Sequence, residues 1–195
     1  MCTKCIIRAA IIAAITMTTS TQVGHATPAN DALAAEARGI VKSFATDLKQ
    51  TLVKTMKGEG PVAAIAVCNV AAPEIAEEKS TGSGWKVGRT SAKLRNAENA
   101  PDTWEAKVLA MFATKKAAGE DLKTMQFYET VEENGKKTFR YMKAIPVGKG
   151  CLACHGENVK DPVKASLKNL YPQDTATGFK VGDLRGAFTL TKPLN

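Results

Sequence analysis

Cys151-Leu152-Ala153-Cys154-His155 is the stretch on which the interpretation of this 195-residue sequence depends. Two thiols three positions apart, followed at once by an imidazole, form the attachment pattern of a c-type haem. In a helical turn, positions i, i+3 and i+4 share one face. The spacing therefore predicts that Cys151 and Cys154 form thioethers with the two haem vinyl groups, and that His155 is the proximal ligand of the iron.

The same residues fit three other kinds of site. A thioredoxin-like redox pair has this cysteine spacing, but it needs no adjacent histidine and usually follows a strand of a βαβ unit. A structural zinc site could combine Cys68 with the two cysteines and His155. A structural disulfide is the third alternative. The adjacent histidine and the expected compartment favour haem over all three.

The N-terminus has the pattern of a secretory signal peptide. Lys4 and Arg8 form a positively charged region, and a short apolar run, residues 9–17, follows. Gly24-His25-Ala26 offers small residues to signal peptidase, so we expect residues 1–26 to be removed. The apolar run is shorter than the ~20 residues of a membrane span. These features predict a periplasmic protein that does not span the membrane after cleavage, in the compartment where bacteria attach haem c.

Cleavage would leave few ligands for the iron. His155 would be the only histidine, because His25 leaves with the signal peptide. Two histidine ligands from one chain would then be excluded. Cys68, in an Ala-rich segment at residues 62–70, is a candidate for the sixth position. Four methionines are alternatives, although each also fits a core stripe or a strand position: Met56, Met111, Met125 and Met142.

The charge balance bears on the kind of partner. The formal charge is +8 at pH 7 and falls to +6 when Lys4 and Arg8 leave with the signal peptide. The remaining basic residues are scattered along the chain, so we expect no nucleic-acid partner. The excess of positive charge is better explained by docking to an acidic redox partner protein, or simply by solubility.

Hydrophobic periodicity, caps and turn residues predict eight main elements. They are helices at residues 31–57, 74–79, 102–118 and 161–170, and strands at residues 85–90, 124–131, 137–147 and 185–194. Pro73 is expected to start the second helix, and residues 80–84 to form a turn after it. The order of helices and antiparallel strands predicts one α+β domain, residues 59–195, preceded by a long amphipathic helix within residues 27–58. This helix packs on the domain or forms an arm that makes a homodimer.

Several motifs in register resemble a bacterial family of PAS-like single-haem c-type domains. The resemblance covers roughly residues 60–195 and rests on Gly60-Pro61, Cys68, residues 72–76, 88–91, 94–96, 99–105, 151–156 and 171–174, Ala176, Gly178 and residues 182–187. It implies a PAS-like antiparallel sheet with flanking helices and one covalent haem c. It also implies that the iron is held between His155 and Cys68.

Three further site residues follow from this resemblance. Arg89 and Arg95 match arginines of the family's motifs, so one of them is expected to meet a haem propionate, with a surface salt bridge as the alternative for each. Tyr171 either lines the haem pocket or packs in the core.

Domains of this family occur in a soluble cyanobacterial haem protein and as the extracytoplasmic part of sensor kinases. A thiolate ligand stabilises ferric haem, and reduction weakens the iron–sulfur bond. Release of Cys68 would then free a position for CO or NO, so a redox- or gas-responsive sensor is expected. A soluble periplasmic electron-transfer cytochrome is the alternative, favoured by the basic charge and by the lack of an output domain in this sequence. An enzyme is not expected, because no distal histidine is available for acid–base work.

Overall fold

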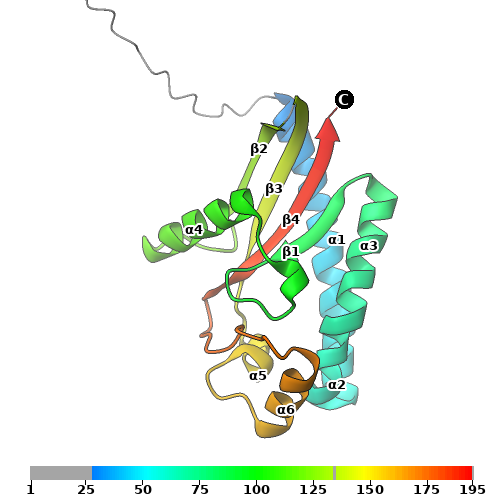
Figure 1. Cartoon of the computed structure of the whole chain (residues 1–195), viewed down its shortest axis with the longest axis vertical. Coiled ribbons are helices and arrows are strands. Elements are labelled where there is room, and N and C mark those ends of the chain that lie inside the picture. Colours follow the sequence, from blue (N-terminus) through cyan, green and yellow to red (C-terminus); the bar gives the residue numbers. More distant parts are fainter. Residues whose placement is uncertain (1–27, 134, 195) are drawn as a thin grey trace, which may run out of the picture.

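Helix α1 (Pro28–Gly58) runs along one face of a four-stranded antiparallel sheet (Figure 1). The computed structural model describes residues 28–133 and 135–194, so the predicted signal peptide and Asn134 lie outside the described residues. The helix has nearly the predicted bounds. It buries Ala37, Val41 and Phe44 against the sheet, which makes it part of the main core. No helix among the described residues combines the length and the apolar character that crossing a membrane requires.

The sheet has the strand order β1-β4-β3-β2. The strands are β1 (Lys86–Thr90), β2 (Gln126–Glu133), β3 (Lys136–Pro146) and β4 (Leu184–Leu194). All three pairings are antiparallel. Successive side chains of a strand alternate between the two faces, so Tyr141 packs towards α1 while Met142 packs on the other side. The α+β fold with its PAS-like antiparallel sheet is thus confirmed.

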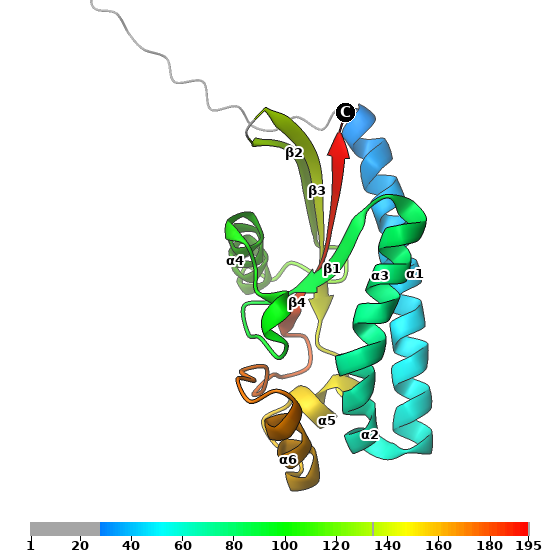
Figure 2. The same cartoon turned by 45° about the vertical axis from the view of Figure 1, so that its right-hand side comes forward.

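Helix α4 (Thr103–Ala117) covers part of the second face of the sheet (Figure 2). Its predicted capping box is present: Asp102 accepts the backbone N–H of Glu105, and Glu105 accepts that of Asp102. The helix buries three apolar residues against the sheet: Val108, Leu109 and Phe112. Three of the four candidate methionine ligands also pack in this cluster: Met111, Met125 and Met142.

The helical run that carries Cys68 is longer and less regular than predicted. Helix α2 (Gly60–Ala66) passes through a π turn, η1 (Val67–Ala71), into α3 (Ala72–Ser83). The N–H of Ala72 reaches back five residues to the carbonyl of Val67. Pro73 has no N–H to donate, and the wide turn admits it without ending the helix.

The predicted turn at residues 80–84 is wrong in its first four residues. The hydroxyls of Ser80 and Ser83 donate to the carbonyls of Ala76 and Lys79, one turn earlier, so these serines fit inside the helix. The helix ends only at Gly84, whose φ of 70° is the left-handed conformation that glycine adopts without strain.

The remaining elements gather beyond the end of β3. A short helical turn, η3 (Lys149–Cys151) and α5 (Leu152–His155), follows the strand. Helix α6 (Asp161–Leu170) has the predicted bounds. Figures 1 and 2 both show α5 and α6 beside α2, and Ile65 of α2 packs with Cys154 in one cluster. The connection from α6 back to β4, residues 171–183, passes over α5.

Candidate haem-binding site

Cys151, Cys154 and His155 share the short helical turn that the sequence predicts. Cys151 is exposed and Cys154 is partly buried, and both thiols are free, as is that of Cys68. Across residues 28–133 and 135–194, no three His, Cys, Asp or Glu side chains are grouped as metal ligands would be.

A loop fixes the position of this turn. Phe179 donates its backbone N–H to the carbonyl of His155 at 3.0 Å, and Gly178 donates to the carbonyl of Gly156 at 3.0 Å. Gly156 is buried, and a Cβ atom there would lie 2.7 Å from the carbonyl oxygen of Leu152. A larger residue would clash with Leu152 one turn earlier, which explains the glycine directly after the histidine.

The imidazole of His155 is held in a single orientation. Its Nδ1 lies 2.7 Å from the carbonyl oxygen of Ala176, so Nδ1 carries the proton and donates it. The Nε2 atom keeps its lone pair and faces Arg95 Nη1 at 3.4 Å. Burial, with the positive charges of Arg185 and Arg95, lowers the pKa of His155 to about 3. A neutral imidazole with Nδ1–H on a carbonyl is the form that ligates metals through Nε2.

Arg95 ties together the segments around His155. Its guanidinium forms a buried ion pair with Asp174 at 3.0 Å, with the two side chains 7% and 9% exposed. It also donates to the carbonyl of Cys154 at 2.6 Å and to that of Ala176 at 3.2 Å. Arg95 is therefore largely engaged by the protein itself, in a buried rather than a surface salt bridge.

Two other arginines reach the same end of the sheet. Arg89 of β1 lies over the ring of Phe44 at 5.8 Å, and no acceptor for its guanidinium is found among the residues described. Arg185 of β4 donates to the hydroxyl of Ser91 at 3.0 Å. Burial lowers the pKa of Arg89, and burial with the charges of Arg95 and Arg89 lowers that of Arg185 to about 10.

Arg185 was missed as a site residue by the sequence reasoning. Arg185 lies within the motif at residues 182–187. The motif alone does not show that β4 pairs with β1, and it is this pairing that brings Arg185 near Arg89 and Arg95. The three cations are accompanied by one carboxylate partner, Asp174. Such a concentration of partly buried positive charge favours an anionic group from outside the chain.

Cys68 lies in the π turn η1, partly buried. Its thiol is close enough to interact electrostatically with Arg89, Tyr171 and Cys154. Tyr171 is 6% exposed and packs with Ile65. The structure thus brings Cys68 and Tyr171 to the end of the molecule where the His155 turn lies.

These residues fit a haem group. The two free thiols lie on one helical turn, His155 offers an unprotonated Nε2, and Cys68 lies on the helix that contacts this turn. Arg89 and Arg185 supply positive charge that two propionates would neutralise.

Comparison with known proteins gives an independent result. The Tll0287-like family model matches residues 9–193 of the chain. The crystal structure of the cyanobacterial heme-protein Tll0287 is similar with a TM-score of 0.62 and 29% sequence identity, over 87% of this chain and 98% of that one. A comparison with curated proteins gives no match.

Proposed function

The chain belongs to the Tll0287-like family, and from this premise we propose that it is an exported, periplasmic protein with one covalent haem c, acting as a redox- or gas-responsive sensor. Cys151 and Cys154 would carry the thioethers, and His155 and Cys68 would be the axial ligands. The partner would be a small gas such as CO or NO that binds the haem, or a redox partner protein that exchanges electrons with it.

One observation carries this proposal: the neutral, oriented imidazole of His155 lies on the same helical turn as two free thiols. A structural histidine needs no unprotonated Nε2, and a disulfide needs no histidine held in this way. The conserved chemistry of haem attachment requires all three groups together.

Haem bound here would supply one-electron chemistry and, with one iron position open, the binding of a small gas. The chain's own residues would do the rest. Ala176 and Arg95 orient His155, while Arg89 and Arg185 provide positive charge for propionates. The apolar clusters beside this turn, which include Ile65 and Phe179, would shield part of the group from water.

The π turn supports a responsive role for Cys68. A π turn is one residue wider than an α-helical turn, and it is frequent at functional sites. Changing the acceptor of Ala72 N–H from the carbonyl of Val67 to that of Cys68 would convert it to an α-helical turn and rotate Cys68. The segment thus has a second hydrogen-bonding arrangement available to it, and a switch requires two such states.

A soluble electron-transfer cytochrome is the second candidate. The formal charge of +6 that would remain after cleavage favours it, because a basic protein docks readily on an acidic partner. Absorption spectra of the exported protein, oxidised and reduced, with and without CO, separate the two. A c-type pyridine haemochrome is expected in both cases. CO binding to the reduced protein supports the sensor, and a spectrum that stays six-coordinate and unresponsive to CO in both redox states contradicts it.

A further inference from the structure

Phe179 is an aromatic neighbour of His155. The centroids of the two rings lie 6.3 Å apart and their planes meet at 83°, which is an edge-to-face pair. Phe179 is 7% exposed and packs with Val147 and Leu152. Its backbone N–H donates to the carbonyl of His155 at 3.0 Å. The phenyl ring is therefore tied through its own backbone to the helical turn that carries the imidazole.

The hydrogen bond to Ala176 leaves one motion of the imidazole free. A carbonyl oxygen accepts hydrogen bonds over a broad range of directions. The 2.7 Å bond from Nδ1 of His155 therefore fixes the tautomer and the place of one edge of the ring, but it tolerates a tilt of the ring plane. A rigid group against the imidazole removes that tilt, and the ring of Phe179 is in the position to do so.

The phenyl ring is itself held in place. Lys93 Nζ lies 5.0 Å and Arg185 Cζ lies 5.6 Å from the centroid of Phe179, within the range of a cation–π contact. Each cation is anchored in turn. Lys93 donates to the carbonyl of Thr177 at 3.0 Å, and Arg185 donates to the hydroxyl of Ser91 at 3.0 Å. Phe179 is thus a fixed surface rather than a side chain that gives way.

The plane of an axial imidazole matters to the iron that it ligates. The π orbitals of the imidazole stand perpendicular to its ring, so the ring plane decides which iron d orbital they overlap. Contacts that orient the ring of a ligating histidine therefore tune the metal as well as hold the ligand. A residue that fixes the plane of His155 would set the electronic anisotropy of a ferric haem at this site.

We propose that Phe179 is a positioning residue for the axial ligand. Its ring fixes the plane of the His155 imidazole, while Ala176 fixes the tautomer. Lys93 and Arg185 act one step further out, by holding the phenyl ring. This inference rests on the proposed haem function and adds to it the group that sets the plane of the ligand.

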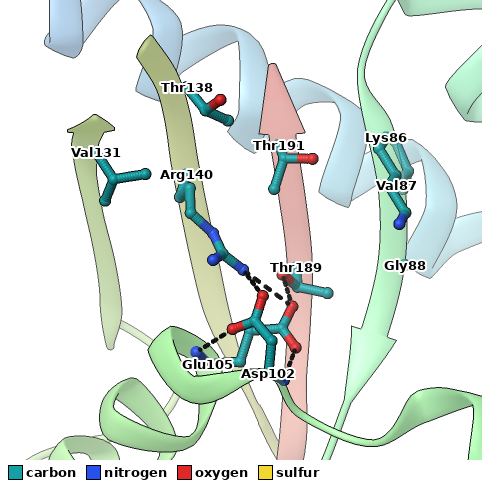
Figure 3. Close-up of a pocket in the computed structure, with 10 residues that line it drawn as sticks. All are labelled: Lys86, Val87, Gly88, Asp102, Glu105, Val131, Thr138, Arg140, Thr189 and Thr191. Atoms are coloured by element: carbon teal, nitrogen blue, oxygen red, sulfur yellow. Dashed lines mark hydrogen bonds and ion pairs between the residues drawn. The ribbon is translucent and has the colours of Figure 1, made fainter. Parts of the chain in front are cut away.

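A similar arrangement on the α4 side of the sheet provides a matched control. Phe127 pairs with Trp104 at 5.9 Å, and Arg140 lies over the Trp104 ring at 4.4 Å. Figure 3 shows Arg140 paired with Asp102 and Glu105 in the adjoining cavity of about 240 Å³. The cluster that contains Phe127 includes no residue of the candidate haem site. Replacing Phe127 therefore removes a ring beside a cation without touching the imidazole.

Electron paramagnetic resonance of the ferric, haem-loaded Phe179→Leu protein tests the proposal. Leucine keeps an apolar side chain at this position but has no ring. The g features should broaden and the largest g value should shift, because the imidazole then adopts a range of planes. In ¹H NMR spectra the spread of the hyperfine-shifted haem methyl signals should narrow for the same reason. Phe127→Leu should leave both kinds of spectrum unchanged, and Phe179→Tyr, which retains a ring, should stay closer to the wild type than Phe179→Leu.

The haem content, measured as the pyridine haemochrome, separates two kinds of failure. A wild-type protein without c-type haem would reject the proposed function itself. Full haem content with unaltered spectra in Phe179→Leu would reject the positioning role alone, even if the variant unfolds at a lower urea concentration. Equal spectral changes in Phe127→Leu would mean a general loosening of the domain and would also reject it. Phe179→Met is a second variant without a ring, and its spectra decide the matter if Phe179→Leu does not fold.

Discussion

His155 Nδ1 lies 2.7 Å from the carbonyl oxygen of Ala176, and that same carbonyl accepts a hydrogen bond from Arg95. The orientation of the imidazole is therefore set by a loop residue that is itself fixed by a buried arginine. Arg95 also holds the carbonyl of Cys154, so it restrains the turn from both sides. In this role Arg95 positions the histidine, while Arg89 and Arg185 are better placed to meet an anion.

Replacing Arg95 should destabilise the protein strongly. Arg95→Gln leaves the carboxylate of Asp174 buried without its partner, and breaking a buried ion pair in this way costs about 3–5 kcal/mol of unfolding free energy. Urea denaturation measures the loss. Lys115→Gln, which breaks the exposed pair with Glu120, is the control and should cost less than about 1 kcal/mol. Similar losses in the two variants would show that the buried pair contributes no more to stability than an exposed one.

Replacing Cys68 should change the colour of the oxidised protein. If its sulfur is the sixth ligand, Cys68→Ala and Cys68→Ser abolish the six-coordinate low-spin ferric spectrum. Met56→Leu is the control, since Met56 is the one candidate methionine that does not pack in the α4 cluster. An unaltered ferric spectrum in Cys68→Ala, or a change in Met56→Leu, would assign the sixth position elsewhere.

Two glycine substitutions should have opposite effects on stability. Gly186 has a φ of 156°, and a Cβ atom there would lie 2.3 Å from the carbonyl oxygen of Thr90. Gly186→Ala should therefore lower the free energy of unfolding by at least about 1–3 kcal/mol. Gly39 lies within α1 with nothing within 4 Å of its would-be Cβ. Gly39→Ala should stabilise by about 0.5–1 kcal/mol. Thermal or urea unfolding of both variants provides the comparison.

The ion pair between Lys116 and Asp183 should contribute to stability only above a certain pH. The Lys116 ammonium and the backbone N–H of Lys180 lower the pKa of Asp183 below its ordinary 3.8. A lowered folded-state pKa gives stability that is present above 3.8 and is lost as the pH falls through the folded value. Asp183→Asn should therefore cost about 0.5–1 kcal/mol at neutral pH and progressively less in acid.

Lys116→Gln provides the matching test of that pair. It should show the same dependence on pH with an equal or smaller loss, because Asp183 also accepts the N–H of Lys180. The double variant should lose no more than Asp183→Asn alone. Additive losses would mean that the two residues act separately.

Local signals in the sequence predicted most of the fold. Alternation of apolar and polar residues predicted the strands. The capping box of Asp102 and Glu105 predicted the start of α4 correctly. The π turn was not foreseen, because one extra residue in a turn barely alters the hydrophobic period and Pro73 reads as a boundary. The candidate haem turn could be proposed from the sequence because its three groups, Cys151, Cys154 and His155, lie within five residues.

What could not be predicted depends on residues far apart in the chain. The pair of Arg95 and Asp174 spans 79 positions, and no local pattern announces it. Arg185 comes near Arg89 only through the pairing of β4 with β1. The cavity at Arg140 likewise needs strands and a helix cap brought together by the tertiary fold.

The extra residue in η1 also changes the direction in which its helix faces. At 100° per residue, Ile65 and Ala76 would lie on nearly the same side of an uninterrupted α-helix. The wider turn offsets them by roughly a quarter of a rotation. Ile65 can therefore pack with α6 while Ala76 packs with α1 and the sheet. Deleting one residue from η1 would turn one of these two residues out of its core. The π turn therefore allows this helix to pack in both cores at once.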